Sequence, residues 1–247
     1  LARLRRSLEI VQWDTDAIAS EAERAINEFM DRNAACVVAG DDWNIIAFVT
    51  PGAEFDGSQA NVCVHGMPIR FGDWADQIDR GVETVIVDVR QIPSNCWPAE
   101  MKCRSRMHYY LADRQAVARR PGARALLLDQ RGFLAEASTA NVVAYYPDRG
   151  LVGPHSGNIL PGVSQLVLGE LAAQVGLDLV ETDLTPDEFV QASEIYLLST
   201  TICMLPIVRV LYGESGDQQI GDGQAGPVFR RLHDAWSAAV GVDIQAQ

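Results

Sequence analysis

Apolar residues recur at helical spacing through the first 32 residues of the chain. One series begins with Leu1 and Leu8, and a second runs from Ile18 to Phe29 after the polar stretch Asp14–Asp16. A repeat of three to four residues places apolar side chains on one face of an α-helix. The pattern therefore predicts two helices. Because Leu1 is not methionine and already belongs to the first series, we expect further residues before it.

Short runs rich in β-branched residues follow and are separated by turns containing Gly, Pro and Asp. They are ACVVAG (35–40), NIIAFVT (44–50), NVCVHG (61–66) and ETVIVDVR (83–90). Such runs are typical of strands. The next segment, QIPSNCWPAE (91–100), contains two prolines and no periodicity, which indicates a connector.

The second half of the chain mixes helical and strand patterns. We predict helices over 105–120, 160–176 and 225–241, strands over 123–129, 139–146 and 193–201, and a hairpin over 207–223. The order of elements favours an α+β fold with two domains, 1–92 and 100–247, joined by residues 93–99. No GxxxxGK[ST] loop is present, so the sequence offers no P-loop for a nucleotide.

Composition excludes several classes of partner. A formal net charge of −13 argues against nucleic acid, whose binders carry a concentrated basic face, and no apolar run is long enough to span a membrane. The five cysteines are scattered and lack CxxC pairing, which favours the cytoplasm over a disulfide framework. The four histidines show no metal spacing, so we predict no metal site and place them at the surface or in the core.

Lys102 is the single lysine of the chain, against nineteen arginines. It is either an ordinary surface residue in an arginine-rich composition or an amine kept for chemistry. Only a primary amine condenses with an aldehyde, and nearby cations such as Arg104 and Arg106 lower the pKa of an amine. Composition leaves both interpretations open. A pyridoxal phosphate enzyme would also need an acid for the pyridine nitrogen and donors for the phosphate.

The segment MKCRSRMHYYLAD (101–113) resembles the lysine segment of the fold type IV pyridoxal-phosphate enzymes. This family comprises the class IV aminotransferases, including branched-chain and D-amino acid aminotransferases, and 4-amino-4-deoxychorismate lyase. The resemblance implies a small α/β N-terminal domain, a larger pseudo-barrel C-terminal domain, and Lys102 as the lysine of the internal aldimine. Ser105 stands where the family often has Asn.

Three later blocks resemble the family's cofactor-binding segments. LLLDQRGFLAEASTANVVAY (126–145) implies that Glu136 holds the protonated pyridine nitrogen. GNILPGVSQLVLGELAAQVG (157–176) implies that Val163 and Ser164, at the start of a helix, bind the phosphate. SEIYLLSTTICMLPIVRV (193–210) places Thr200 at the phosphate and Thr201 at the substrate carboxylate.

Two arginines complete the implied set. LARLRRSLEI (1–10) is similar to a family helix whose arginine, Arg3 here, binds the phosphate, and VDVRQIPSNCWPAEMK (87–102) makes Arg90 a neighbour of the cofactor O3′. Residues 34–84 match poorly, and Pro51 stands where arginine is frequent. IGDGQAGPVFRRL (220–232) also matches a family segment, which we interpret as structural.

The resemblance implies an aminotransferase that exchanges an amino group between an amino acid and a 2-oxo acid, acting as a homodimer with pyridoxal 5′-phosphate as cofactor. Two alternatives remain. A 4-amino-4-deoxychorismate lyase would share every residue named above, and a non-catalytic relative would have the fold without the covalent cofactor.

Overall fold

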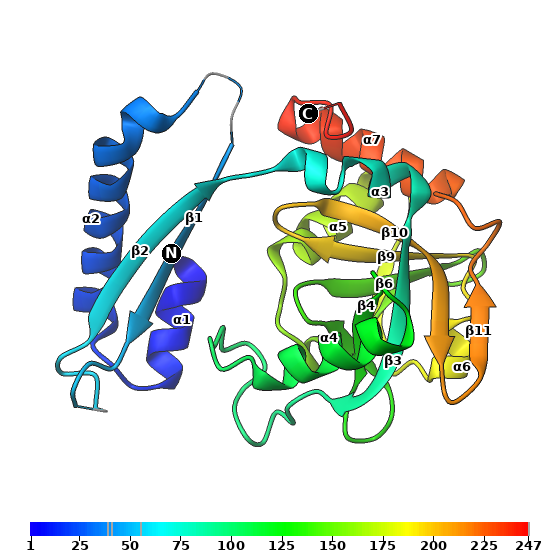
Figure 1. Cartoon of the computed structure of the whole chain (residues 1–247), viewed down its shortest axis with the longest axis horizontal. Coiled ribbons are helices and arrows are strands. Elements are labelled where there is room, and N and C mark those ends of the chain that lie inside the picture. The colour runs from blue at the N-terminus through cyan, green and yellow to red at the C-terminus, as the bar shows by residue number, and fades with distance from the viewer. Residues whose placement is uncertain (39, 41, 55, 247) are drawn as a thin grey trace. The chain divides into compact units, whose positions relative to one another are not determined.

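The computed structural model describes residues 1–38, 40, 42–54 and 56–246. Contacts between Cα atoms divide the chain into two compact units (Figure 1). Unit 1 contains Leu1–Arg70 and Met101–Cys103, and unit 2 contains Phe71–Glu100 and Arg104–Gln247. The predicted connector at 93–99 therefore lies inside unit 2, and the first change of unit comes after Arg70.

Unit 1 contains two helices and a two-stranded antiparallel sheet. Its elements are α1 (Ala2–Ile10), α2 (Thr15–Asn33), the short 3₁₀ helix η1 (Ala34–Cys36), β1 (Trp43–Thr50) and β2 (Asn61–Pro68). The Asp14 carboxylate accepts a hydrogen bond from Ala17 N at 3.0 Å and caps α2, as the polar stretch predicts. A Cβ at Gly66 would lie 2.8 Å from Phe29 Cζ, so β2 passes very close to α2. Both predicted helices and two of the predicted strands are confirmed.

The predicted strand over 35–40 is wrong for the residues that the structure describes. η1 continues α2 by one 3₁₀ turn through Cys36, and Val37 and Val38 are 49% and 66% exposed. Ala39 lies outside the described residues. Branched side chains favour a strand only where a partner strand and a packed face exist, and here β1 and β2 pair with each other.

Unit 2 is built on a mixed sheet of nine strands within the described residues. The strands follow the order β5-β4-β3-β10-β9-β6-β7-β8, and β11 adds to β10. The sheet curls into part of a barrel (Figure 1), in agreement with the predicted pseudo-barrel. The strands are β3 (Val82–Arg90), β4 (Arg124–Leu128), β5 (Leu134–Ala137), β6 (Asn141–Tyr146), β7 (Gly150–Gly153), β8 (Leu179–Glu181), β9 (Glu194–Ser199), β10 (Cys203–Tyr212) and β11 (Gly216–Gln219).

Helices cover this sheet and close two apolar clusters. They are η2 (Phe71–Asp73), α3 (Ala75–Arg80), α4 (Met107–Arg119), η3 (Ser156–Asn158), α5 (Val163–Gln174), α6 (Pro186–Phe189) and α7 (Pro227–Val240). The larger cluster includes side chains of α5 and α7 with most of the strands, and the smaller one joins α4 to β3 and β4. Fully burying one Leu or Phe side chain contributes roughly 1.5–3 kcal/mol to the free energy of folding. The two clusters therefore stabilise the sheet, whose edge carries the polar residues described below.

β3 explains why the change of unit differs from the predicted boundary. The strand pairs in parallel with both β4 and β10, so its hydrogen bonds belong to the large sheet. A pattern of apolar residues predicts a strand but not its neighbours.

Among the described residues, no helix is long and apolar enough to cross a membrane.

A buried carboxylate closes the C-terminal helix onto the sheet. Glu194, at the start of β9, accepts hydrogen bonds from Val228 N at 2.9 Å and Phe229 N at 2.8 Å, in the first turn of α7. A Cβ at Gly226 would overlap the Glu194 carboxylate. The glycine of the 220–232 segment therefore makes room for a cap, which supports the structural interpretation of that segment.

Candidate active site

Glu136 lies on β5 with its side chain almost completely buried, at 5% exposure. Its Oε1 accepts hydrogen bonds from the Gln91 side-chain amide and from Tyr109 Oη, the latter at 2.7 Å. Its Oε2 faces Leu160 N at 3.3 Å. Several donors around one carboxylate favour its ionised form in spite of burial. Unit 2 therefore presents a buried carboxylate that hydrogen bonds hold in a fixed direction.

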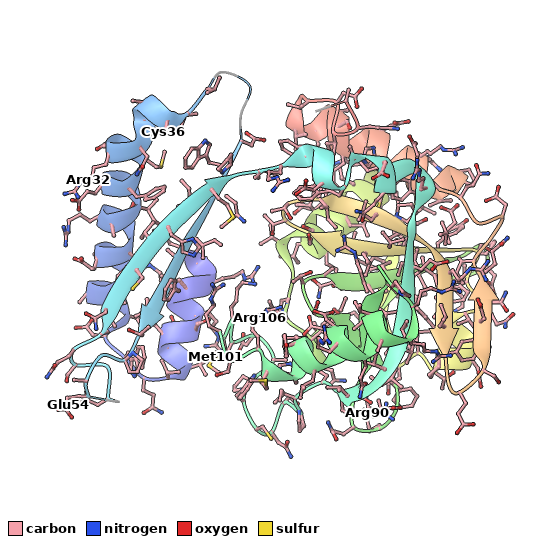
Figure 2. The ribbon with its side chains drawn as sticks, in the orientation of Figure 1. Arg32, Cys36, Glu54, Arg90, Met101 and Arg106 are labelled. Atoms are coloured by element: carbon pink, nitrogen blue, oxygen red, sulfur yellow. The ribbon has the colours of Figure 1, made fainter. Side chains whose placement is uncertain are left out.

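Gln91 directly follows β3 and is buried. Its backbone N–H donates to Leu128 O at 2.9 Å, which extends the β3–β4 pairing by one bond. Its side-chain Nε2 also lies 3.0 Å from Tyr109 Oη. The sequence interpretation missed Gln91 and named its neighbour Arg90, which is exposed at the end of β3 (Figure 2). A polar residue directly after a buried strand was the available signal.

The first turn of α4 supplies the aromatic part of the cluster. The ring centroids of His108 and Tyr109 are 3.9 Å apart, and the Arg106 guanidinium carbon lies 4.7 Å from the Tyr109 centroid. Burial, together with the Glu136 charge, raises the pKa of Tyr109. Burial, together with Arg106, lowers the pKa of His108. Near neutral pH the phenol is therefore a hydrogen-bond donor and the imidazole is uncharged.

The entrance of α5 is a tight backbone turn. Asn141 Nδ2 donates to Leu160 O at 2.8 Å, and a Cβ at Gly162 would overlap Asn141 Oδ1. Within the described residues no side chain caps α5, whose first residues are the exposed Val163 and the buried Ser164. The first amides of a helix attract anions. This turn therefore has the backbone form of a phosphate site, and Asn141, which sequence reasoning did not select, holds it.

The loop after β9 lies at the same edge of the sheet. Asn141 pairs with Leu198 in the β6–β9 register, so Thr200, two residues later, follows directly beyond this pair. Thr200 is exposed and Thr201 is half-buried. The loop closes at Cys203, which pairs with Ser199 and has the left-handed φ of 50°. The sheet topology thus brings the Thr200 loop and the α5 entrance to the same strand end.

Arg3 and Lys102 belong to unit 1, where Ser7 links their backbones. Ser7 Oγ lies 3.2 Å from Lys102 N and 3.0 Å from Arg3 O, one helical turn away. Among the described residues, Arg3 Nη2 is a buried nitrogen with no hydrogen-bond partner, and burial lowers the pKa of Arg3. A buried guanidinium nitrogen in this condition suits an anionic ligand.

The predicted site residues thus fall into two groups within the described structure. Glu136, Ser164 and Thr200 belong to unit 2, whereas Arg3 and Lys102 belong to unit 1. Among the described residues, no group of three or more His, Cys, Asp or Glu side chains could hold a metal ion. Unit 1 thus offers one amine and a buried guanidinium nitrogen, and unit 2 offers one buried acid and a helix start suited to an anion.

Comparison with known proteins identifies the family that has these features. A family model described as amino-transferase class IV matches residues 1–210. Branched-chain-amino-acid aminotransferase-like protein 2 of Arabidopsis thaliana is 32% identical over 112 residues, 45% of this chain and 19% of that protein. The branched-chain-amino-acid aminotransferase of Escherichia coli K12 is 21% identical over 180 residues, 73% of this chain and 57% of that protein.

Solved structures of branched-chain aminotransferases share the fold. A T.th. enzyme complexed with N-(5′-phosphopyridoxyl)-L-glutamate superposes with a TM-score of 0.76 at 22% identity, covering 97% of this chain and 77% of that one. The Thermobaculum terrenum enzyme in its PLP form gives 0.77 at 20% identity, covering 99% and 78%.

These matches define the chain first as a fold type IV protein. More specifically, it belongs to the class IV aminotransferase family, whose model covers most of its length. The matched part of the chain spans 19% of the length of the Arabidopsis protein and 57% of the length of the Escherichia coli enzyme.

Proposed function

We propose that this chain is a pyridoxal-phosphate-dependent aminotransferase that exchanges an amino group between an amino acid and a 2-oxo acid. The observation that carries the proposal is the buried Glu136 carboxylate, held by donors from Gln91, Tyr109 and Leu160. The family model supports it, as do the two solved relatives, one complexed with N-(5′-phosphopyridoxyl)-L-glutamate and the other in its PLP form.

The described residues fit this cofactor. Arg3 Nη2 is a buried nitrogen without a partner among them, and the α5 entrance has glycine at the position where Asn141 excludes a Cβ. Both features suit a phosphate. Lys102 is the single primary side-chain amine of the chain, and Glu136 is the buried acid that a pyridine nitrogen needs.

Each residue then has a role. Lys102 would hold the cofactor at its aldehyde carbon, and Glu136 would keep the ring nitrogen protonated. The phosphate would be bound by Arg3, by Thr200, and by Val163 and Ser164 at the start of α5. Thr201 would face the substrate carboxylate, and Arg90 would lie near O3′. When bound, the cofactor supplies an electron sink for the pair released when the Cα proton leaves.

Lys102 and Glu136 have complementary tasks in this proposal. The Lys102 amine, once the substrate amine has taken its place, would accept the proton from the substrate Cα and deliver it to the cofactor's aldehyde carbon. Glu136 remains ionised throughout, because the donors around it favour its charged form. A histidine or arginine in place of Lys102 could not both hold an aldehyde and move a proton.

Borohydride reduction of the purified protein with pyridoxal phosphate, followed by peptide mapping, tests the proposal. We expect a pyridoxyl adduct on the peptide containing Lys102, and its loss in Lys102→Arg. Amino-group exchange with 2-oxoglutarate, measured over a panel that includes branched-chain amino acids, tests the reaction. An adduct on another peptide would overturn the assignment.

The same assays separate the alternatives. Release of pyruvate from aminodeoxychorismate without amino exchange would indicate the lyase, and protein that remains colourless with added cofactor would indicate a non-catalytic relative. The homodimer and the cytoplasmic location stay predictions, and analytical ultracentrifugation of the full-length protein tests the first.

A further inference from the structure

Two side chains from different elements converge on one oxygen of Glu136. Gln91, at the end of β3, and Tyr109, in the first turn of α4, both donate to Oε1, and their own polar atoms lie 3.0 Å apart. Together the three side chains form a triangle of hydrogen bonds. In a buried environment such bonds are stronger than in water, and each restrains the direction of the others.

The orientation of the Gln91 amide follows from its surroundings. Ile92 N is a donor and lies 3.1 Å from the oxygen end of the amide, so that end is Oε1 and the NH₂ group faces Glu136. His108 Nε2 lies 3.1 Å from the same oxygen and therefore carries its proton. The Gln91 amide therefore accepts a hydrogen bond from His108 at its oxygen and donates one to Glu136 from its nitrogen, so its orientation is fixed at both ends.

Tyr109 is held as firmly as Gln91. Its ring is flanked by His108 and by the Arg106 guanidinium, at 3.9 Å and 4.7 Å between the respective centres. Burial and the Glu136 charge raise the pKa of the phenol, so it keeps its proton and remains a donor near neutral pH. Removing its hydroxyl deletes a hydrogen bond to a charged group and leaves the ring in place.

We propose that Gln91 and Tyr109 are positioning residues for Glu136, which fix the direction of its carboxylate and keep it ionised opposite the cofactor ring nitrogen. This inference rests on the proposed function. It predicts that losing either donor weakens the hold on the ring-nitrogen proton while the rest of the cofactor site stays intact. Hydrogen bonds to charged groups are strong enough for each loss to lower cofactor affinity roughly tenfold or more.

The test compares Tyr109→Phe and Gln91→Met with two matched controls. Tyr110→Phe removes a phenol hydroxyl from the next residue, which is 62% exposed. Gln115→Met removes the amide oxygen that faces Asp88 N and Val89 N at 3.2 and 3.4 Å, away from Glu136. All four variants and the wild type are loaded with pyridoxal phosphate labelled with ¹⁵N in the ring.

Two readouts do not depend on turnover. The ¹⁵N shift reports protonation of the ring nitrogen, and titration of the apoprotein gives the cofactor dissociation constant. We expect the Glu136-directed variants to move the shift toward the unprotonated value and to raise the dissociation constant about tenfold or more, whereas the controls match the wild type. Unchanged shifts and affinities in Tyr109→Phe would overturn the inference, whether or not Gln91→Met folds.

The outcome for the wild type separates this inference from the proposed function. A wild-type protein that forms no adduct at Lys102 would overturn both. A wild type that forms the adduct, with variants indistinguishable from it, would overturn the positioning role alone. Equal effects in the controls and in the Glu136-directed variants would show a general loss of packing and would also overturn it.

Discussion

Unit 2 contains two buried glutamates that look alike by burial but differ in what holds them. Glu136 and Glu194 are 5% and 8% exposed. Glu194 is held mainly by backbone amides at the start of α7, with Tyr196 Oη at 2.9 Å. Glu136 is held mainly by side chains 45 and 27 residues away in sequence.

The difference separates an acid that caps a helix from an acid held by side chains, which is the arrangement we propose for the cofactor site. Backbone amides in a helix first turn are satisfied by an acid that caps them, so Glu194 stabilises the fold. Side-chain donors that converge on Glu136 close no helix. They fix the direction of the carboxylate, as a group that meets a ligand requires.

The largest expected effect is on activity, from Glu136→Gln. An amide cannot keep a ring nitrogen protonated, so we expect kcat to fall on the order of a hundredfold or more, comparable to losing a preorganised electrostatic group. The free energy of unfolding of the apoprotein should fall by no more than about 1–3 kcal/mol, because the amide keeps one acceptor oxygen for these donors. Steady-state kinetics and urea unfolding check the two parts, and activity within a few-fold of wild type would contradict the role of Glu136.

Glu194→Gln should reverse that pattern. The variant keeps the volume but weakens charge-assisted bonds to the α7 amides, so we expect a loss of about 2–3 kcal/mol in the free energy of unfolding. The kcat of the protein that remains folded should stay close to wild type. Urea unfolding with activity normalised to the folded fraction measures both, and a selective loss of kcat would erase the contrast with Glu136.

Gly162→Ala tests the turn at the start of α5. The added Cβ would overlap Asn141 Oδ1, so the turn must shift, at a cost of about 1–3 kcal/mol. Because the same turn opens α5, affinity for pyridoxal phosphate should fall as well. Gly169→Ala, where the nearest atom would be Leu179 Cδ2 at 3.6 Å, is the matched control. Equal cofactor affinity in both variants would exclude the phosphate role of this turn.

The α7 region should also respond to acid. Burial lowers the pKa of His233 from 6.5, against the opposing effect of Asp234, Asp243 and Asp79. Below pH 6.5 the unfolded chain therefore binds a proton that the folded chain resists. Uncharged His233 therefore contributes its full share to the free energy of unfolding above pH 6.5. This share is lost as the pH falls from 6.5 through the lower pKa of His233 in the folded chain.

His233→Phe should flatten that dependence. The pKa of His108 is lowered as well, so we expect a smaller slope of unfolding free energy between about pH 6.5 and 5 rather than none. Urea unfolding at several pH values measures it. A variant with the wild-type slope would show that His233 contributes nothing to acid sensitivity.

The smallest expected effect comes from Cys203→Gly. Cys203 has a left-handed φ of 50°, which costs a non-glycine residue about 1–2 kcal/mol. Glycine relieves this strain but frees the unfolded chain, so the net gain should be below about 1 kcal/mol. Thermal unfolding measures the difference. A clear loss of stability would mean that packing of the half-buried thiol outweighs the strain.

Much of the fold could be predicted from local pattern. Helical spacing located α1, α2, α4, α5 and α7, and branched runs located the long strands. The pattern missed β5, because four residues that are all buried show no alternation. It also placed a strand at 35–40, where the chain has no partner to pair with in the described residues.

The sequence by itself determined which residue types were available: a single amine, an acid within a recognisable block, and glycine before a helix. Only the tertiary structure decided that Gln91, and not Arg90, turns toward Glu136. Neighbouring residues at a strand end point to opposite faces of the sheet. Because both faces of β3 carry buried residues, its residue types do not show which face carries the polar cluster. The bonds that hold Glu136 join residues far apart in sequence, and folding alone brings them together.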